Sequence, residues 1–565
     1  MHTEDFLWLT IATGQVIVCY RDWQCWMLLF ESMLCFLFAT FDPATFTISL
    51  SRMKSMRWSP QKHQQREHMT HLAGVQMGVV LVPSLLQTMA IHCSRNEHCN
   101  INQECSQSSS TWNRYSKIAT ILSITPQTSV SSGCLLFIIL FFDPSILSID
   151  TVTTASLPIY IACVAILFFP VVTKKNNSTK SFTFGELRVV SLLLLVIILE
   201  YFRLITSPLP IAQIGSHADS ATTATISSLY SLVALAGSLS CCAFAYAGSS
   251  PYIRRKFSWW WRVGLNIVGP LLAIDLSLYL YLDITRTITT AETIIGSSTK
   301  VSFILYLVPL SLRWLIKFLI ERENGYMRLW GLLYWLIVLV LTSFPTYLLS
   351  SEQSAPTGGN ENRTRDKVPV VVTRKWFHLI AVLLFGPITW QFPQLMSLSY
   401  AIATCALIVL ETLRNDAPLL QSFYSTFLDD NKDHRDDVII SHIFLIVGCA
   451  APLWINQVVF TRNHVLLTEF GIICVGVGDA MGAIVGKSIG KHHWGMNCRT
   501  IEGSIAMWSS MIVIGMFACT SMQEYFILFA ATTFTTILEA FTVQLDNLVL
   551  PLSGSTIILL LVRYS

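Results

Sequence analysis

The chain has 565 residues, of which 53% are apolar and only 13% are charged, and its mean hydropathy is +0.56. Soluble domains carry about 25% charged residues, so the composition excludes a soluble multidomain enzyme. The formal net charge of +3 gives no strong field toward nucleic acid, and we expect no nucleic-acid partner. Apolar stretches recur along the whole chain. The fold class that we predict is therefore all-α, a polytopic integral membrane protein.

Spanning helices need ~20 mostly apolar residues, and roughly 14 to 16 segments meet this template. The apolar run 6–20 follows two acids and lacks a cleavage pattern, so we interpret it as retained rather than as a signal peptide. The clearer predicted spans of the first part are 72–91, 157–172, 189–206, 226–247, 263–282, 301–320 and 329–349. Those of the last part are 376–390, 395–413, 438–460, 466–485, 504–519, 525–542 and 548–562.

A polar stretch with a proline and paired glycines interrupts these segments and indicates a linker. We predict an N-terminal multi-spanning region at 1–349, a linker at 350–369 and a C-terminal membrane domain at 370–565. Basic clusters border several segments and favour the cytosolic side for their loops. Isolated acids in the first two thirds form no motif, whereas the polar groups of the last third come in organised sets.

The first polar set stands at the start of an apolar segment. Arg374 and Lys375 suit an interfacial anchor. His378 follows Arg374 by four residues, so the two share one helical face. Anchoring alone explains the first two residues, and a functional role for the set remains open.

The second set is the sequence GVGDA, which contains Gly478 and Asp479. Glycines recur every fourth residue from Gly478 to Gly490, a spacing typical of close helix packing in lipid. Packing explains the glycines but not an acid that follows nine uncharged residues. A carboxylate on a glycine-lined helix can approach a metal ion or a phosphate, and we favour a functional role for Asp479.

The third set is a basic loop between two apolar segments, from Lys487 to Ser504. It combines cations, hydroxyl groups and one acid, Glu502. Cations and backbone amides near a helix start suit a polyphosphate. The alternative is a cytosolic loop that merely follows the positive-inside tendency.

The fourth set contains Glu539, Asp546 and Asn547. Seven residues separate the two acids, so on a continuous helix they would share one face. Carboxylates at this spacing could hold a divalent metal, with Asn547 as a neutral oxygen ligand. Solvation of a helix end is the alternative.

Together these sets offer what phosphoryl transfer requires, namely positioning and charge neutralisation. The chain resembles the dolichol kinases of the CTP-dependent polyprenol kinase family, which also includes phytol kinases and CTP-dependent diacylglycerol kinases. The resemblance rests on four motifs: RKxxH beginning at Arg374, GxGDA containing Asp479, RTIEGS beginning at Arg499, and the C-terminal segment with Glu539 and Asp546. It covers residues 370–565, about the last third. Family members commonly have lysine where this chain has Arg499.

The resemblance implies that CTP from the cytosol phosphorylates dolichol in the bilayer of the endoplasmic reticulum, giving dolichyl phosphate for protein glycosylation. It also implies a divalent metal ion, Mg or Ca. The residues expected to bind CTP are Arg374, Lys375, His378, Gly478, Gly486, Lys487, Ser488, Gly490, Lys491, Arg499, Thr500 and Gly503. The catalytic candidates are Asp479, Arg499, Glu502, Glu539 and Asp546. The metal candidates are Asp479, Glu539, Asp546 and Asn547.

Within these roles, Asp479 would bind metal or orient the dolichol hydroxyl, and Lys487 and Arg499 would neutralise phosphate charge. Glu502 would either hold Arg499 or contact the nucleotide. Two other functions stay open: kinase activity on another lipid alcohol (a polyprenol, phytol or diacylglycerol), and transport. No inverted repeat, which many transporters have, is visible in the sequence.

Overall fold

The computed structural model describes separate stretches of the chain, and most of the described residues lie in its second half. They are 81–89, 184–206, 233–234, 236–241, 243, 256–284, 310–354, 370–414, 441–460, 463–494, 499–542 and 546–562. The apolar run 6–20 and the predicted span 157–172 lie outside the described residues, as do most of 72–91 and 226–247 and the first half of 301–320. The number of spanning helices therefore stays a prediction.

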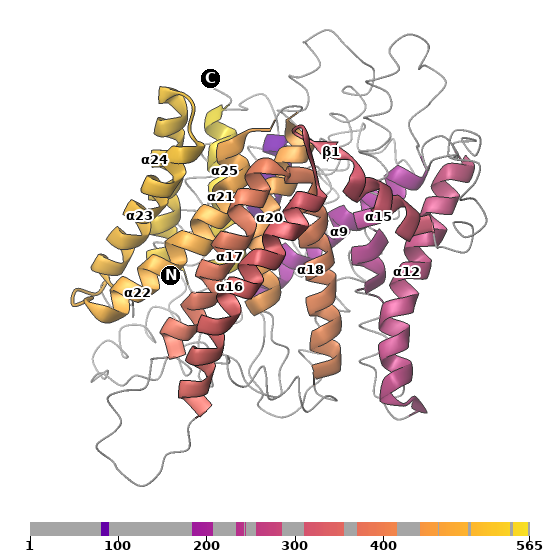
Figure 1. Ribbon diagram of the computed structural model, residues 1–565. Coiled ribbons are helices and arrows are strands. Elements are labelled where there is room, and N and C mark those ends of the chain that lie inside the picture. The colour runs from indigo at the N-terminus through magenta and orange to yellow at the C-terminus, as the bar shows by residue number, and fades with distance from the viewer. Residues whose placement is uncertain are drawn as a thin grey trace, which may run out of the picture. The chain divides into compact units, whose positions relative to one another are not determined.

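The described residues are almost entirely helical, which confirms the all-α fold class (Figure 1). The helices up to residue 414 are α9 (Phe184–Thr206), α12 (Trp259–Ile284), α15 (Leu310–Ile320), α16 (Leu329–Ser354), α17 (Val370–Gln391) and α18 (Pro393–Arg414). After them come α20 (Ser441–Val459), α21 (Val465–Gly471), the π-helix η3 (Ile472–Gly478), α22 (Asp479–Ser488), α23 (Ile501–Gly515), the 3₁₀ turn η4 (Met516–Ala518), α24 (Met522–Phe541) and α25 (Asp546–Val562).

Six helical segments of the described residues are long and apolar enough to cross a membrane. They are Trp259–Tyr279, Pro393–Glu411, His442–Val459, Val465–Ser488, Ile501–Ala518 and Met522–Phe541. Each coincides with a segment predicted from its apolar run, because in lipid a chain can satisfy its own backbone groups only as a helix or a closed barrel. The chain is thus a multi-pass membrane protein. α16 continues to Ser354, so its end overlaps the first residues of the predicted linker. The boundaries of the linker and of the two membrane regions stay a prediction.

Contacts divide the chain into two compact units, one of 197–428 and one of 1–196 with 429–565. The unit of 197–428 contains a short β-hairpin between α15 and α16. Its strands, β1 (Arg322–Glu323) and β2 (Tyr326–Met327), are antiparallel and joined by Asn324 and Gly325. Both turn residues have positive φ, 50° and 84°, which is the requirement of a type I′ turn.

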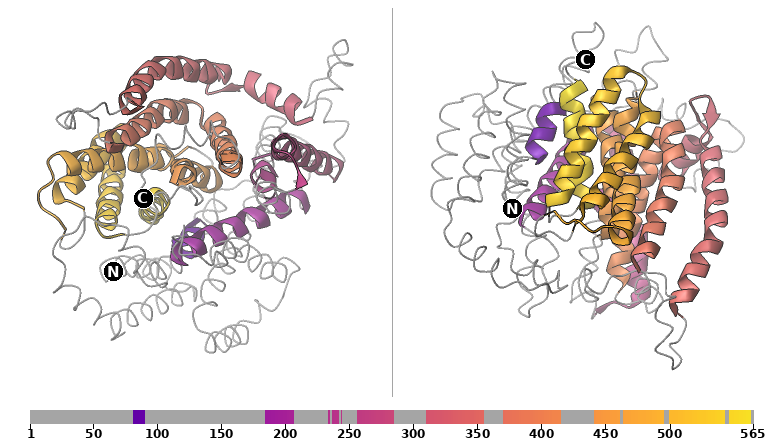
Figure 2. Two further views of the ribbon diagram at one scale, coloured as in Figure 1. Left: turned by 90° about the horizontal axis from the view of Figure 1, so that it is seen from below. Right: turned by 90° about the vertical axis from the view of Figure 1, so that its left-hand side faces the viewer.

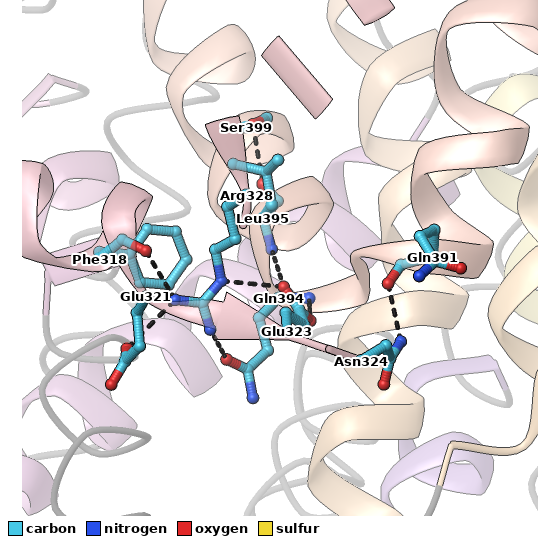
Figure 3. Close-up of polar contacts among 9 residues, drawn as sticks. All are labelled: Phe318, Glu321, Glu323, Asn324, Arg328, Gln391, Gln394, Leu395 and Ser399. Carbon is cyan, nitrogen blue, oxygen red and sulfur yellow. Dashed lines mark hydrogen bonds and ion pairs between the residues drawn. The ribbon is translucent and has the colours of Figure 1, made fainter. Parts of the chain in front are cut away.

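Arg328, directly after this hairpin, is 3% exposed and is bonded through every nitrogen of its guanidinium (Figure 3). Its Nε donates to Glu323 Oε2 at 2.9 Å, and its Nη2 donates to Gln394 Oε1 at 2.6 Å. Its Nη1 donates to the carbonyl of Phe318 at 2.7 Å and to Glu321 at 3.2 Å. Glu323 in turn accepts from the backbone N–H of Gln394 at 2.7 Å. This cluster, the Arg328 clasp, ties the hairpin to the N-terminus of α18.

The last helices of the other unit pack closely (Figure 2), and α24 contacts both α23 and α25. Two glycines permit the closest approaches. A Cβ on Gly448 of α20 would overlap the backbone oxygen of Asn547, and one on Gly554 of α25 would overlap the ring of Phe470. The close contact at Gly448 fixes the start of α25, which carries Asp546, against α20.

Candidate active site

The loop between α22 and α23 forms a hairpin-like turn. The backbone N–H of Trp494 donates to the carbonyl of Arg499 at 3.1 Å, and that of Ile501 donates to the carbonyl of His492 at 2.8 Å. His493 and Thr500 form the bridge between these pairs, and residues 495–498 lie outside the described part. The pairing brings Arg499 back to the start of α23. The backbone pairing of the basic loop therefore fixes the position of Arg499 beside the first turn of α23.

Arg499 joins two acids from two other elements. Its Nη1 forms an ion pair with Glu539 Oε1, near the end of α24, and its Nη2 lies 3.5 Å from Asp546 Oδ2, in the first turn of α25. The side chain of Arg499 is 24% exposed, against 17% for Glu539 and 34% for Asp546. We call these three residues the Arg499 triad. It lies where three helix ends meet and remains within reach of solvent.

The two acids do not share one continuous helix. α24 ends at Phe541 and α25 begins at Asp546. The interpretation that Glu539 and Asp546 share one face of a single continuous helix is therefore wrong. Arg499 and the close packing of α24 against α25 bring the acids together. The break after Phe541 places the last turn of one helix beside the first turn of the next.

Glu502 contacts the loop and not Arg499. Its carboxylate accepts from the backbone N–H of His492, 3.2 Å from each oxygen, and lies 2.6 Å from Nδ1 of the same histidine. The expectation that Glu502 holds Arg499 is therefore wrong, since Arg499 pairs with Glu539 and Asp546. Contact between Glu502 and a nucleotide stays a prediction. Glu502 closes the loop onto the first turn of α23, where an acid also suits the helix dipole.

The glycines around the loop pack α22 against α23. A Cβ on Gly503 would lie 2.7 Å from the carbonyl oxygen of Gly482. Gly486 and Gly490 leave room for the side chain of Thr500, because a Cβ on either would lie within 2.9 Å of its Oγ1. Thr500 in turn caps α23 by accepting from the N–H of Gly503 at 3.2 Å. This geometry supports the packing interpretation, and nucleotide binding by these residues stays a prediction.

The remaining predicted phosphate ligands of the loop differ in whether their polar groups are already hydrogen-bonded. Lys487 and Lys491 are exposed. Ser488 is also exposed, but its hydroxyl donates back to the carbonyl of Ile484 at 2.8 Å. Two flexible cations therefore stand at the end of α22, on the loop that carries Arg499.

Asp479 follows a helix irregularity. It is the first residue of α22, directly after the π-helix that ends at Gly478, and π-helical turns are frequent at functional sites. Asp479 is half-buried, and Gly478 before it leaves room for Met511, which a Cβ would approach within 2.7 Å.

The predicted metal ligands do not form a complete site in the described part of the chain. Oxygen donors such as Asp479, Glu539, Asp546 and Asn547 suit Mg²⁺ or Ca²⁺ chemically. However, the described residues contain no group of three His, Cys, Asp or Glu that could hold a metal ion. Two of the four donors are paired with Arg499 instead. The described side chains therefore do not fit a metal held by protein ligands alone.

The RKxxH residues belong to α17, in the unit of 197–428. Arg374, Lys375 and His378 lie in the first turns of that helix, and His378 is half-buried. The structure confirms the helix start there. Binding of CTP by these residues stays a prediction.

Trp494 is a site residue that was not among the candidates predicted from the sequence. Its indole N–H donates to Ser504 Oγ at 2.9 Å, and its ring lies edge-on to Phe541 with centroids 5.5 Å apart. It therefore connects the loop to α23 and to the end of α24, two residues beyond Glu539. A tryptophan beside a basic loop was visible in the sequence, but its partners were not.

A second polar cluster lies at the opposite end of α24. His464 Nδ1 accepts from the N–H of Leu467 and caps α21 at 3.4 Å, while its Nε2 lies 3.5 Å from Glu524 Oε1. Asn456 Oδ1 accepts from the backbone N–H of His464 at 3.0 Å. Burial lowers the pKa of His464 below its usual value, and the charge of Glu524 opposes this only in part. His464 therefore connects the start of α21 to the first turn of α24.

The chain is similar to dolichol kinases of several organisms. It is 30% identical over 251 residues to dolichol kinase sec59 of Schizosaccharomyces pombe, covering 42% of this chain and 48% of the relative. It is 30% identical over 253 residues to dolichol kinase EVAN of Arabidopsis thaliana, covering 42% and 41%. With the dolichol kinase of Homo sapiens it shares 29% over 261 residues, 43% and 46% of the two chains. The matches thus span just under half the length of these relatives. No protein-family model and no solved structure matches the chain.

Proposed function

Because this chain belongs to the dolichol kinase family, we propose that it transfers the γ-phosphoryl group of CTP to the terminal hydroxyl of dolichol. The observation that supports this most strongly is the Arg499 triad, in which a guanidinium and two carboxylates meet at the ends of apolar helices. A site at the ends of membrane-spanning helices is accessible to a nucleotide from the aqueous side and to a long isoprenoid alcohol from the bilayer. Phosphoryl transfer requires these two substrates to meet at one site.

The cations of the loop would take the phosphates. Lys487 and Lys491 are exposed at the end of α22 and can follow a flexible polyphosphate, since a lysine ammonium is a mobile point charge. Arg499 has a planar guanidinium that matches phosphoryl oxygens. A phosphoryl group that reaches Arg499 would compete with Asp546, the more exposed of its two acids and the one at the longer distance of 3.5 Å.

The acids would act on the acceptor hydroxyl. Asp479 is half-buried in the span that ends with Lys487 and Ser488. We propose that it orients the dolichol hydroxyl, with Glu539 and Asp546 as further proton acceptors. A carboxylate within hydrogen-bond reach of the attacking hydroxyl can remove its proton as the bond from that oxygen to the γ-phosphorus forms. The bond between the γ-phosphorus and the bridging oxygen of the β-phosphate breaks in the same transfer, and CDP leaves. No step is assigned to a metal ion, because the described donors do not assemble a site for one.

The proposed cellular setting follows the same logic. A multi-pass protein acting on dolichol with a soluble nucleotide requires a membrane with a cytosolic face, and we propose the endoplasmic reticulum. The loop from Lys487 to Glu502 would face the cytosol, as its basic residues favour. The product would be dolichyl phosphate, the lipid carrier for protein glycosylation.

The deciding experiment incubates membranes containing the full chain with γ-labelled CTP and dolichol. We expect labelled dolichyl phosphate with CTP and little with γ-labelled ATP, and we expect Asp479→Asn to lose most of the product. The matched control is Asp275→Asn, an acid in α12 whose Oδ1 accepts from the N–H of Ser311 at 2.7 Å, because the amide can keep that bond. If a labelled product forms only with phytol or diacylglycerol, that alcohol and not dolichol is the acceptor. Absence of any labelled lipid with either nucleotide would overturn the proposed function.

A further inference from the structure

Three buried threonines of α24 look alike in the sequence but differ in their hydrogen bonds. Thr532 Oγ1 donates to the carbonyl of Leu528 at 2.8 Å, and Thr535 Oγ1 donates to that of Ala531 at 2.8 Å. Such bonds to the preceding helical turn are a common way for a threonine to satisfy its hydroxyl in an apolar helix. Thr536 is also buried, at 7% exposed, yet its Oγ1 has no hydrogen-bond partner in the part of the chain that the structure describes.

An unpartnered hydroxyl at such depth is unfavourable. A buried polar group that loses its bonds to water without gaining others costs free energy, and the two neighbouring threonines show that a backbone bond is available on this helix. Valine would have nearly the same shape at position 536 without this cost. The hydroxyl of Thr536 therefore calls for an explanation other than packing.

Thr536 is adjacent to the Arg499 triad. It precedes Glu539 by three residues in the same helix, so the two side chains lie on neighbouring positions of one face. α24 is a candidate membrane span that runs from Met522 to Phe541. Thr536 lies about 4.5 Å deeper along the helix axis than Glu539, farther from the helix end where Glu539 meets Arg499.

We propose that Thr536 binds the hydroxyl of the lipid alcohol and holds it toward the Arg499 triad. This inference rests on the proposed function and adds a specific contact to it. An alcohol that arrives from the bilayer reaches the depth of Thr536 before that of Glu539. Its hydroxyl can accept from and donate to the threonine hydroxyl, which has both capacities. Thr536 is thus a substrate-binding residue for the acceptor and not for the nucleotide.

The test compares single variants of the full chain in membranes, with labelled CTP and dolichol both varied. Thr536→Val removes the hydroxyl at nearly constant shape, Thr536→Ser keeps it, and Thr532→Val is the matched control on the same helix. We expect Thr536→Val to raise the KM for dolichol about three- to tenfold, the loss of one hydrogen bond, with the KM for CTP unchanged. Thr536→Ser and Thr532→Val should keep the wild-type KM for dolichol.

Thermal unfolding adds a readout that a purely structural threonine would not give. Because Thr536→Val removes an unpaired buried hydroxyl, its unfolding temperature should equal or exceed that of the wild type while dolichol binding weakens. If Thr536→Val does not accumulate in folded form, Thr536→Ala against Thr536→Ser decides the same question.

The outcomes separate the inference from its premise. Equal KM values for dolichol in Thr536→Val, Thr532→Val and wild type would overturn the inference and would indicate a water molecule or an empty space at the hydroxyl. A parallel rise in the KM for CTP would also overturn it, because the contact would then not be specific to the acceptor. A wild-type chain that phosphorylates no lipid alcohol would overturn the proposed function itself.

Discussion

Arg328 and Arg499 each lie between two carboxylates, but the two arginines use their guanidinium groups differently. Arg328 is almost fully buried, and its nitrogens are taken by Glu321, Glu323, an amide oxygen and a backbone carbonyl. It also lies over the ring of Phe318, 4.0 Å from its centroid. Arg499 is 24% exposed, and its contact with Asp546 is 3.5 Å.

This contrast shows how the same residue types can serve the fold or a ligand. A guanidinium whose donors are all bonded within the protein has none left for a ligand, so the Arg328 clasp is a structural element. A guanidinium held mainly by charge, at a solvent-accessible end, can exchange one carboxylate for a phosphoryl group. Exposed lysines on the same loop as Arg499 provide further positive charge for such a group.

We expect the greatest change in activity from Arg499→Met. Loss of a charge that stabilises the transferring phosphoryl group costs about 10²- to 10³-fold in turnover, whereas the unfolding temperature should change little because the site is partly hydrated. Formation of labelled dolichyl phosphate and thermal unfolding of the same membranes measure both. Arg499→Lys, which keeps the charge and loses the planar donor pair, should have a turnover between those of wild type and Arg499→Met. Near-normal turnover of Arg499→Met would remove the functional contrast with Arg328.

The next effect is on stability, from Arg328→Met. Removal of one partner from a buried ion pair leaves uncompensated charge and typically costs about 3–5 kcal/mol. We expect a large loss of folded protein, with turnover per folded molecule kept. The double variant Arg328→Met with Glu323→Gln should recover part of the loss, because it neutralises the carboxylate that Arg328→Met leaves buried without its partner. A single variant that unfolds at the wild-type temperature would show that the clasp does not stabilise the fold.

Long elements of this fold could be predicted from the sequence, whereas their interruptions could not. The apolar runs placed all six candidate spans of the described residues, because length and hydropathy suffice for that. The π-helix before Asp479 and the break after Phe541 depend on packing against neighbouring helices. For the same reason the partners of Arg499 and of Glu502 were not predictable, although both residues were named as candidates.

Polar contacts between residues far apart in the sequence could not be predicted from the sequence either. Arg328 bonds Gln394, 66 residues away, and no local pattern indicates such a partner. The three threonines at 532, 535 and 536 differ only in where each hydroxyl points, which is a property of rotamer and neighbours. In contrast, the Asn-Gly dipeptide between α15 and α16 is a strong local hairpin signal, and it could have been predicted.

We expect a smaller change in stability from substitutions of Asn324 in the hairpin turn. These variants test how much the Arg328 clasp depends on the conformation of that turn. Asn324 has a φ of 50°, and its Nδ2 donates to the carbonyl of Gln391 at 2.7 Å. Asn324→Ala should destabilise the protein by about 1–2 kcal/mol, because alanine is strained in the left-handed region and the side-chain bond is lost. Asn324→Gly loses only the bond, which is exposed, and should cost less than alanine. Thermal unfolding of the two variants separates the conformational part from the hydrogen bond. If alanine and glycine cost the same, the turn conformation contributes nothing, and the Arg328 clasp holds the hairpin to α18 without help from the turn.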